Sequence, residues 1–347
     1  MPNPPSIHAP TPDSAPRGTD TLDIACWQRS LREAIRTPAE LLKVLGLEPS
    51  AVDGFEPGSE EFTLLVPRSF VARMRKGDPR DPLLLQVLPQ RREQLEIPGF
   101  ARDPLGETSL AQDGVLKKYA GRALLVTTAA CPIHCRYCFR RHFPYPAQTA
   151  GRSGWSGALT ALRNAGEVTE IILSGGDPLS LADRRLAELV AEIESVGSVD
   201  TLRVHTRFPI VLPERVTGAL LEILSKTRLS TVMVVHCNHA NEIDAAVRAG
   251  LRELKSTGTH LLNQSVLLRG VNDDADRLEA LSRSLFDSGV LPYYLHLLDP
   301  VAGAAHFDVA ESHGRELIAR LRDRLPGYLV PRLVREEPGE LSKTTVS

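Results

Sequence analysis

The sequence predicts an α/β protein in which a parallel sheet of six βα units follows a helical N-terminal region. The chain has 347 residues, enough for one large domain or two smaller ones. From about Lys117 onward, short β-branched runs alternate with amphipathic stretches, whereas apolar residues recur at helical spacing before that point. Strands that alternate with helices form parallel βαβ units. Periodicity alone leaves open whether the sheet is doubly wound or is a full or partial (β/α) barrel.

The composition is that of a folded globular protein and excludes several other classes. Hydrophobic residues make up 42% and charged residues 24%, which argues against a collagen-like chain, a coiled coil or wholesale disorder. With 41 Lys and Arg against 43 Asp and Glu, no bulk field attracts nucleic acid or an anionic membrane. No apolar run approaches the roughly 20 residues of a membrane span, and residues 1–20 lack the features of a signal peptide. A cytoplasmic location without a membrane partner is therefore expected.

Residues 1–115 divide into a tail and a helical region. Residues 1–20 hold six prolines among Ser, Thr and Asp, which predicts a disordered tail. Residues 21–115 form the predicted helical region, because apolar residues recur at helical spacing between Asp23 and Leu47. Within it, Thr37 is the predicted N-cap and Pro38 the first residue of a second helix. A further short helix is predicted at Arg68–Lys76.

Residues 116–347 form the predicted domain of alternating strands and helices. The expected strands are Ala123–Thr128, Glu170–Ser174, Thr201–Thr206, Thr231–His236, Leu261–Leu267 and Pro292–Leu298, with a further extended run at Tyr328–Val334. The expected helices between them include Leu181–Val196, Pro213–Ser225, Ala240–Ser256 and Arg277–Ser288. Distinctive residues follow directly after these strands, so they should meet at the carboxyl edge of the sheet.

Three cysteines lie close together just after the first predicted strand. The chain has five cysteines, an odd number that makes a poor disulfide framework. Cys131, Cys135 and Cys138 fall within eight residues, and soft thiolates select zinc or an iron–sulfur cluster. A [4Fe–4S] cluster normally takes four cysteines, so three would leave one iron open. The alternatives are a structural zinc site completed by His134 or His142, or buried inert thiols.

The CxxxCxxC spacing of these cysteines resembles that of radical S-adenosylmethionine (SAM) enzymes. The segments 122–126, 135–145, 174–179, 263–273 and 292–296 together resemble the lysine 2,3-aminomutase family, and the resemblance covers about residues 22 to 347. It is closest to the branch whose β-lysine is used to modify elongation factor P. The resemblance implies a partial (β/α)6 TIM-type barrel of the radical SAM type, a [4Fe–4S] cluster held by the three cysteines, SAM, pyridoxal 5′-phosphate (PLP), and a 1,2 amino shift on lysine.

The resemblance also assigns cofactor-binding residues. For SAM it implies Ser174, Gly175, Gly176 and Asp177, where glycines let the backbone approach a ligand and Asp177 could meet an ammonium, together with His236 and Gln264. For PLP it implies Lys343 as the Schiff-base lysine, with Lys118, Tyr119 and Arg122 in the same pocket. Without the resemblance, SGGD would be a turn, His236 or Gln264 a polar core residue, and Lys343 a solvated charge. The segment before Lys343 departs from the family, since its glycine-rich run is reduced to Pro338-Gly339-Glu340 and Thr345 replaces a proline.

For the substrate, the resemblance implies Arg140 as the partner of the lysine carboxylate, and Asp299 and Glu336 as partners of its ammonium. Read without it, Arg140 and Arg141 could form a small nucleic-acid patch with Tyr137 and Phe139, and the two acids could be solvated.

The hypothesis that follows is an isomerase that converts L-α-lysine to (R)-β-lysine for elongation factor P and its lysyl-transferring ligase, with an electron donor for the cluster and no direct contact with nucleic acid. The lack of a cysteine-containing extension after Lys343 favours this branch. The alternatives are a metabolic 2,3-aminomutase for lysine or another amino acid, and a zinc-stabilised nucleic-acid-binding module.

Overall fold

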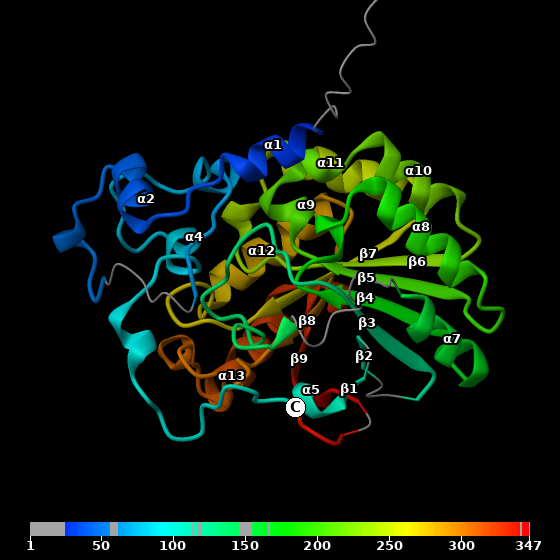
Figure 1. Ribbon diagram of the computed structural model, residues 1–347. Helices are drawn as coiled ribbons and strands as arrows, with labels where there is room; N and C mark the ends of the chain where they lie inside the picture. Colours follow the sequence, from blue (N-terminus) through cyan, green and yellow to red (C-terminus); the bar gives the residue numbers. More distant parts are fainter. Residues whose placement is uncertain are drawn as a thin grey trace, which may run out of the picture.

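The computed structural model describes residues 25–55, 62–112, 114–116, 120–145, 155–165, 167–340 and 342–346. The tail predicted at residues 1–20 and the predicted PLP-pocket residues Lys118 and Tyr119 lie outside this described part. Within it, ten strands form one sheet, and their order in the sheet is their order in the chain (Figure 1).

Six parallel strands make up the centre of this sheet. They are β3 (Arg122–Thr128), β4 (Glu170–Gly175), β5 (Thr201–Thr206), β6 (Ser230–Val235), β7 (His260–Val266) and β8 (Leu291–His296). A doubly wound sheet reverses its strand order at a switch point, and the sequential order here excludes that topology. The outer edges of β3 and β8 pair with further strands and not with each other, so the sheet stays open. The fold is therefore α/β, with the predicted partial (β/α)6 barrel.

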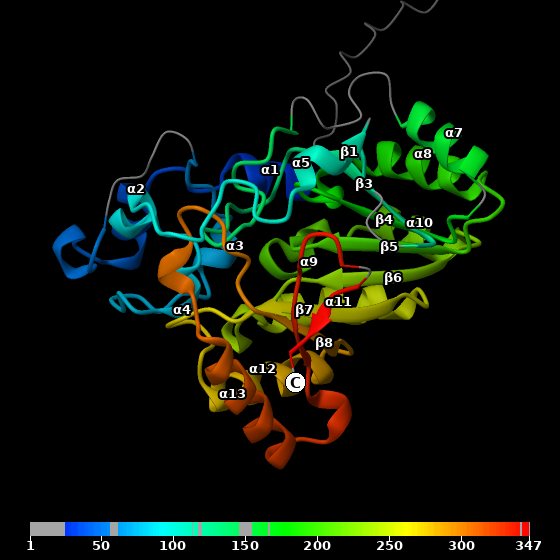
Figure 2. The same ribbon diagram turned by 90° about the horizontal axis from the view of Figure 1, so that it is seen from below.

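A helix follows each of these six strands. The helices are α7 (Ser156–Ala165), α8 (Asp183–Glu194), α10 (Gly218–Lys226), α11 (Ala245–Ser256), α12 (Ala275–Asp287) and α13 (Glu311–Arg324), and they lie around the outside of the strands (Figure 2). No helix in the described part of the chain is long and apolar enough to cross a membrane.

Two predicted helices are interrupted by an N-cap inside their predicted range. Thr217 accepts a hydrogen bond from the Leu220 N–H, so α10 begins at Gly218 after a separate 3-10 turn, η4 (Pro213–Arg215). Asp244 accepts from the Val247 N–H in the same way, which separates α11 from η5 (Ala240–Glu242). Apolar periodicity runs across both breaks and therefore hid them.

The N-terminal region consists of short helices at one end of the barrel. They are α1 (Cys26–Arg32), α2 (Pro38–Leu45), η1 (Pro49–Ala51), α3 (Arg68–Val71), α4 (Pro82–Leu85), η2 (Arg91–Gln94) and α5 (Glu107–Leu110). Thr37 is the N-cap of α2, as predicted, because its side chain accepts from the Glu40 N–H. The helix predicted at Arg68–Lys76 ends at Val71. Trp27 packs edge-on against Phe208 of α9 (Phe208–Val211), with ring centroids 5.6 Å apart, so this region shares a core with the barrel.

Short strands extend the sheet at both edges. β1 (Ala111–Gln112) and β2 (Val115–Leu116) pair antiparallel next to β3. β9 (Arg332–Arg335) lies parallel to β8, and β10 (Thr344–Thr345) pairs antiparallel with β9. The extended run predicted at Tyr328–Val334 is partly wrong, because Pro326 opens a 3-10 turn, η7 (Gly327–Leu329), before β9 begins.

The inner face of the barrel is polar and only partly covered. In β5, Leu202, Val204 and Thr206 are buried, while Thr201, Arg203 and His205 on the opposite face are half-buried. β7 alternates in the same way, with Gln264 on the half-buried face. Parallel strands covered on both faces are usually apolar throughout. This alternation therefore marks a lumen with room for a polar ligand.

Candidate functional site

The three cysteines lie on a loop that leaves the carboxyl end of β3, and the N-terminal region holds this loop from outside. The His134 N–H donates to the Leu65 carbonyl at 3.0 Å, and the Arg136 N–H donates to the Gln86 carbonyl at 2.9 Å. A turn then brings the Cys138 N–H to the Cys135 carbonyl at 3.0 Å. The backbone of the cysteine loop (residues 129–138) is thus fixed without any metal.

Gly175 and Gly176 hold the same loop from the barrel side. The Gly176 N–H donates to the Thr128 carbonyl at 2.6 Å, and the Asp177 N–H donates to the Ala130 carbonyl at 2.8 Å. A methyl group at Gly176 would overlap the Ala130 carbonyl and lie 2.8 Å from the Ala129 oxygen. Gly175 has φ +123°, and a methyl group there would lie 2.7 Å from the Thr128 oxygen. The close approach that the glycines allow is therefore first of all to the cysteine loop, where the sequence suggested a ligand.

Asp177 is buried, and its carboxylate accepts hydrogen bonds from the protein itself. Its Oδ1 accepts from the Leu179 N–H at 3.0 Å and from the Thr206 hydroxyl at 2.7 Å, while its Oδ2 accepts from the Arg207 N–H at 2.7 Å. Burial raises the pKa of Asp177 to about 6 even though these hydrogen bonds favour the charged form. Asp177 thus ties β4 to β5, and its predicted contact with an ammonium would have to share this carboxylate. Contact of Ser174 and Asp177 with SAM stays a prediction.

The thiols fit a multinuclear cluster better than a single zinc ion. Within the described residues, no group of three or more His, Cys, Asp or Glu side chains converges as one metal ion requires. The two histidines proposed to complete a zinc site face backbone carbonyls, His134 Nδ1 at 2.8 Å from Thr63 and His142 Nε2 at 3.1 Å from Ala302. Burial raises the pKa of Cys138 to about 11, so binding of any metal by this thiol must displace its proton. Three soft donors on one short loop match the ligand set of an iron–sulfur cluster.

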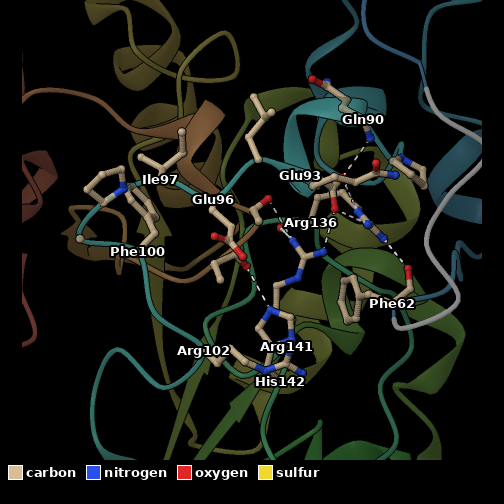
Figure 3. A pocket seen from close by; sticks show the side chains of 17 residues that line it. Phe62, Gln90, Glu93, Glu96, Ile97, Phe100, Arg102, Arg136, Arg141 and His142 are labelled. Atoms are coloured by element: carbon tan, nitrogen blue, oxygen red, sulfur yellow. Dashed lines mark hydrogen bonds and ion pairs between the residues drawn. The ribbon is translucent and has the colours of Figure 1, made fainter.

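A cavity of about 850 Å³ lies on the outer side of the cysteine loop (Figure 3). Its lining includes Arg136 of the cysteine loop, Arg141 and His142 directly after this loop, and Glu93 of η2. Arg136 and Arg141 both form ion pairs with Glu93, so the two guanidinium groups share one carboxylate. None of the residues predicted to bind SAM, PLP or substrate is among those lining it. This cavity is therefore not the predicted site.

Three histidines of the lumen lie near predicted site residues. His205 and His236 have ring centroids 5.9 Å apart, and His296 lies at the end of β8. Burial, together with the charges of Arg207, Lys343 and Arg140, lowers the pKa of His236 to about 3. Burial also lowers the pKa values of His205 and His296, and the positive charge of Lys343 lowers both further. All three imidazoles are therefore neutral near pH 7.

The lumen contains polar atoms that the protein itself leaves without a partner. The Nε2 atoms of His205 and His296 are buried and have no hydrogen-bond partner. A buried polar atom without a partner costs free energy and is normally satisfied by a ligand or water. Gln264, on the same inner face, is paired in register with Tyr294. A polar cofactor with several acceptor atoms fits this lining.

Lys343 is anchored by β10. The Val346 N–H donates to the Leu333 carbonyl at 2.9 Å, and the Val346 side chain is buried. The Lys343 ammonium pairs with Glu336 and lies 5.9 Å from the centroid of the Tyr294 ring. Figure 2 shows the C-terminal segment, coloured red, on the side of the sheet away from α7 and α8. The position predicted for the Schiff-base lysine thus lies in the lumen and not in solvent.

The predicted substrate residues lie around the same lumen. Glu336 directly follows β9 and Asp299 follows β8, and these two strands are parallel neighbours. Arg140 is buried, and its positive charge contributes to the lowered pKa values of His205 and His236. Arg122 begins β3, opposite Glu170 of β4 in register, so it lies at the far end of that strand from the cysteine loop. The structure therefore brings Arg140, His236, Glu336 and Lys343 together and leaves Arg122 further down the barrel.

Glu107 is a residue of this site that the sequence did not reveal. Its carboxylate accepts from Arg140 Nε at 2.6 Å and from Nη2 at 3.1 Å, while Arg140 Nη1 donates to the Ser174 hydroxyl at 2.8 Å. All three nitrogen atoms of the guanidinium thus have protein partners. Glu107 follows Gly106 as the first residue of the short helix α5, and nothing in the local sequence pattern links it to an arginine 33 residues away.

Comparisons with known proteins give sequence matches over most of the chain. The chain is 46% identical over 320 residues to the L-lysine 2,3-aminomutase of Escherichia coli (strain K12), covering 92% of this chain and 93% of that protein. It is 33% identical over 328 residues to the L-lysine 2,3-aminomutase of Clostridium subterminale, covering 92% and 77%. A solved radical SAM methyltransferase from Sphaerobacter thermophilus is 18% identical, with a TM-score of 0.42 over 64% of this chain and 68% of that one. No family model matches the chain.

The contact between Gly176 and the cysteine loop can be tested by adding one methyl group. Gly176→Ala should lower the free energy of unfolding of the apoprotein by about 1–3 kcal/mol, because the methyl group overlaps fixed backbone. Gly157→Ala is the matched control, since a methyl group there meets nothing within 4 Å, and it should stabilise α7 by about 0.5–1 kcal/mol. Urea unfolding measures both. Equal stability of Gly176→Ala and the wild type would contradict the contact.

Proposed function

The chain belongs to the L-lysine 2,3-aminomutase family, and we propose that it is a radical SAM, PLP-dependent enzyme that converts L-α-lysine into (R)-β-lysine. Membership makes the chain an enzyme of the isomerase class. The observation that most supports the proposal is that Lys343, paired with Glu336, lies 5.9 Å from the centroid of the Tyr294 ring on β8, while Arg140 donates to Ser174 near the end of β4. Residues proposed for the two ends of the reaction thus lie around one lumen beside the cysteine loop.

Each cofactor has candidate residues with matching chemistry. Cys131, Cys135 and Cys138 would hold the [4Fe–4S] cluster, and Ser174 to Asp177 with His236 and Gln264 would line the SAM site. Lys343 and Arg122, with Lys118 and Tyr119 outside the described residues, would hold PLP. When bound, the cluster with SAM supplies a carbon-centred radical, and PLP supplies the electron sink for nitrogen migration.

The chain's own residues prepare the lumen for a charged amino acid. The three imidazoles are neutral because their pKa values are lowered, so they can accept hydrogen bonds without repelling an ammonium. Glu336 holds the Lys343 ammonium, so the lumen already pairs a lysine side chain with a carboxylate. The unpartnered Nε2 atoms of His205 and His296 offer further polar contacts.

Recognition of lysine requires a partner for each of its charged ends. Asp299 and Glu336 follow adjacent parallel strands and would replace the water around the distal ammonium, whose burial without a partner costs several kcal/mol. Arg140 would receive the carboxylate. Since Glu107 accepts from Nε and Nη2 of this guanidinium and Ser174 accepts from Nη1, Arg140 must share or release one of these partners to bind the substrate.

We propose further that the β-lysine is used to modify elongation factor P, in keeping with the branch that the sequence resembles. Removing the protein from cells should shift elongation factor P to an unmodified mass, and added (R)-β-lysine should restore the modified mass. An unchanged mass, with free β-lysine lost, would instead indicate a metabolic aminomutase.

Cluster assembly should depend on three of the five cysteines. Replacing Cys131, Cys135 or Cys138 by Ala should abolish the iron and sulfide content of a [4Fe–4S] cluster after anaerobic reconstitution, because no other thiol lies on the loop. Cys26, which is exposed on α1, and Cys237, whose thiol faces the His239 carbonyl, are the matched controls and should leave it unchanged when replaced by Ala. A full cluster in two of the three loop variants would rule out the assignment.

Lys343 should carry PLP. Borohydride reduction of the PLP-loaded protein should attach the pyridoxyl group to the peptide that contains Lys343, as detected by peptide mass spectrometry. Lys343→Ala should remove the label and the activity, whereas Lys226→Ala, on the exposed end of α10, should change neither. Label on a different lysine would show that the C-terminal segment does not supply the Schiff base.

The substrate assignment can be tested with the product and with Asp299. The wild-type protein, reduced and free of oxygen, should form (R)-β-lysine from L-lysine. Asp299→Asn should lower this activity by a hundredfold or more, in line with the roughly 3–5 kcal/mol lost when one partner of a buried ion pair is removed. Asp308→Asn, at an exposed position, is the control. Normal turnover by Asp299→Asn, or a wild-type preference for an amino acid without a second ammonium, would exclude this mode of recognition.

A further inference from the structure

Arg207 is a buried arginine directly behind the cysteine loop, and none of the roles proposed above uses its side chain. It follows β5 and is 6% exposed. Its backbone N–H donates to Asp177 Oδ2 at 2.7 Å, which fixes it beside the glycine motif. Its Nη1 lies within hydrogen-bonding distance of the Cys135 sulfur. Within the described part of the chain, no other arginine side chain donates to a thiol.

The other side of the guanidinium is held by a buried polar network. Nη2 donates to Gln86 Oε1 at 2.7 Å and to Glu242 Oε2 at 3.1 Å. Glu242 is completely buried, and its other oxygen accepts from the Asn238 N–H at 2.9 Å and from Gln86 Nε2 at 3.1 Å. The guanidinium therefore cannot turn away from Cys135 without leaving Glu242 Oε2, a buried charged acceptor, without its donor.

Aromatic rings enclose the same guanidinium. The rings of Phe70 and Tyr137 lie with centroids 5.5 and 5.7 Å from its central carbon. The Tyr137 hydroxyl accepts from Asn238 Nδ2 at 2.6 Å, so this ring belongs to the network as well. A charge in such surroundings is weakly screened and acts strongly on a group in direct contact with it.

We propose that Arg207 is a positioning residue that donates an N–H to the Cys135 sulfur and thereby raises the reduction potential of the bound cluster. The inference rests on the proposed function, which assigns the cluster to this loop. Reduction adds a negative charge to the cluster, so a fixed cation and an N–H···S hydrogen bond stabilise the reduced form more than the oxidised form. Glu242 lies on the far side of the guanidinium, so the positive end of the ion pair faces the sulfur.

Replacing Arg207 alone would leave Glu242 buried without its counter-charge, so the test uses a charge-balanced pair. Arg207→Met with Glu242→Gln removes the hydrogen bond and both charges together. Glu242→Gln alone separates the effect of the carboxylate. Arg203→Met with Glu170→Gln is the matched control, since this Arg–Glu pair lies on β4 and β5 and neither side chain contacts a cysteine. Arg207→Lys keeps the charge without the planar fork.

The readout is the midpoint potential of the reconstituted cluster without SAM, from an anaerobic redox titration followed by electron paramagnetic resonance. At a fixed potential, the ratio of reduced to oxidised cluster should fall tenfold or more in Arg207→Met/Glu242→Gln, which is about 59 mV for a one-electron couple. Arg207→Lys should lie between this variant and the wild type. The Arg203→Met/Glu170→Gln control should match the wild type.

Each other result contradicts the inference in a distinct way. A variant that keeps its iron and the wild-type potential would show that Arg207 has no influence on the cluster. Loss of iron from every Arg207 variant, with normal loading in Glu242→Gln, would make Arg207 a residue for assembly and not for potential. A wild-type protein that binds no iron and sulfide would instead contradict the proposed function, and the inference with it.

Discussion

The close approach of two backbone segments, 129–130 and 175–176, is the constraint on which the rest of the site depends. Glycine is required because any side chain there would overlap the carbonyl groups of the cysteine loop. Just beyond the carboxyl end of β4, the Gly176 N–H donates to Thr128, the last residue of β3, and the Asp177 N–H donates to Ala130 of the cysteine loop. The position of the three thiols therefore follows from strand pairing in the sheet, and the barrel and the cysteine loop form one rigid unit.

Buried carboxylates pair with the arginines that lie around this unit. The N-terminal region supplies Glu93 to Arg136 and Arg141, and Glu107 to Arg140, while the barrel loops supply Glu242 to Arg207. A buried arginine without a carboxylate would be strongly destabilised. The short helices before the barrel therefore do more than enlarge the core, because they supply the carboxylates that pair with the buried arginines of residues 136–141.

The sequence predicts the barrel well because its strands combine β-branched residues with abrupt turns. The boundaries of β3 to β8 differ from the predicted ones by at most two residues, and Thr37 is the N-cap it was expected to be. Local periodicity carries no information on strand order, so the partial barrel was predicted from the family resemblance and not from periodicity. The thiols were found because three lie on one loop. Glu107 and the network around Arg207 were not, because their partners are distant in sequence and each acid or amide alone resembles a surface residue.

The anchoring of Lys343 by β10 has a consequence for the order in which the protein matures. β9 and β10 follow all six barrel strands in the chain, so the ribosome completes the cysteine loop and its supports well before it adds this lysine. A chain that stops before β9 would therefore contain the three thiols but lack the residue proposed to hold PLP, so the two proposed cofactor sites are completed by different parts of the chain.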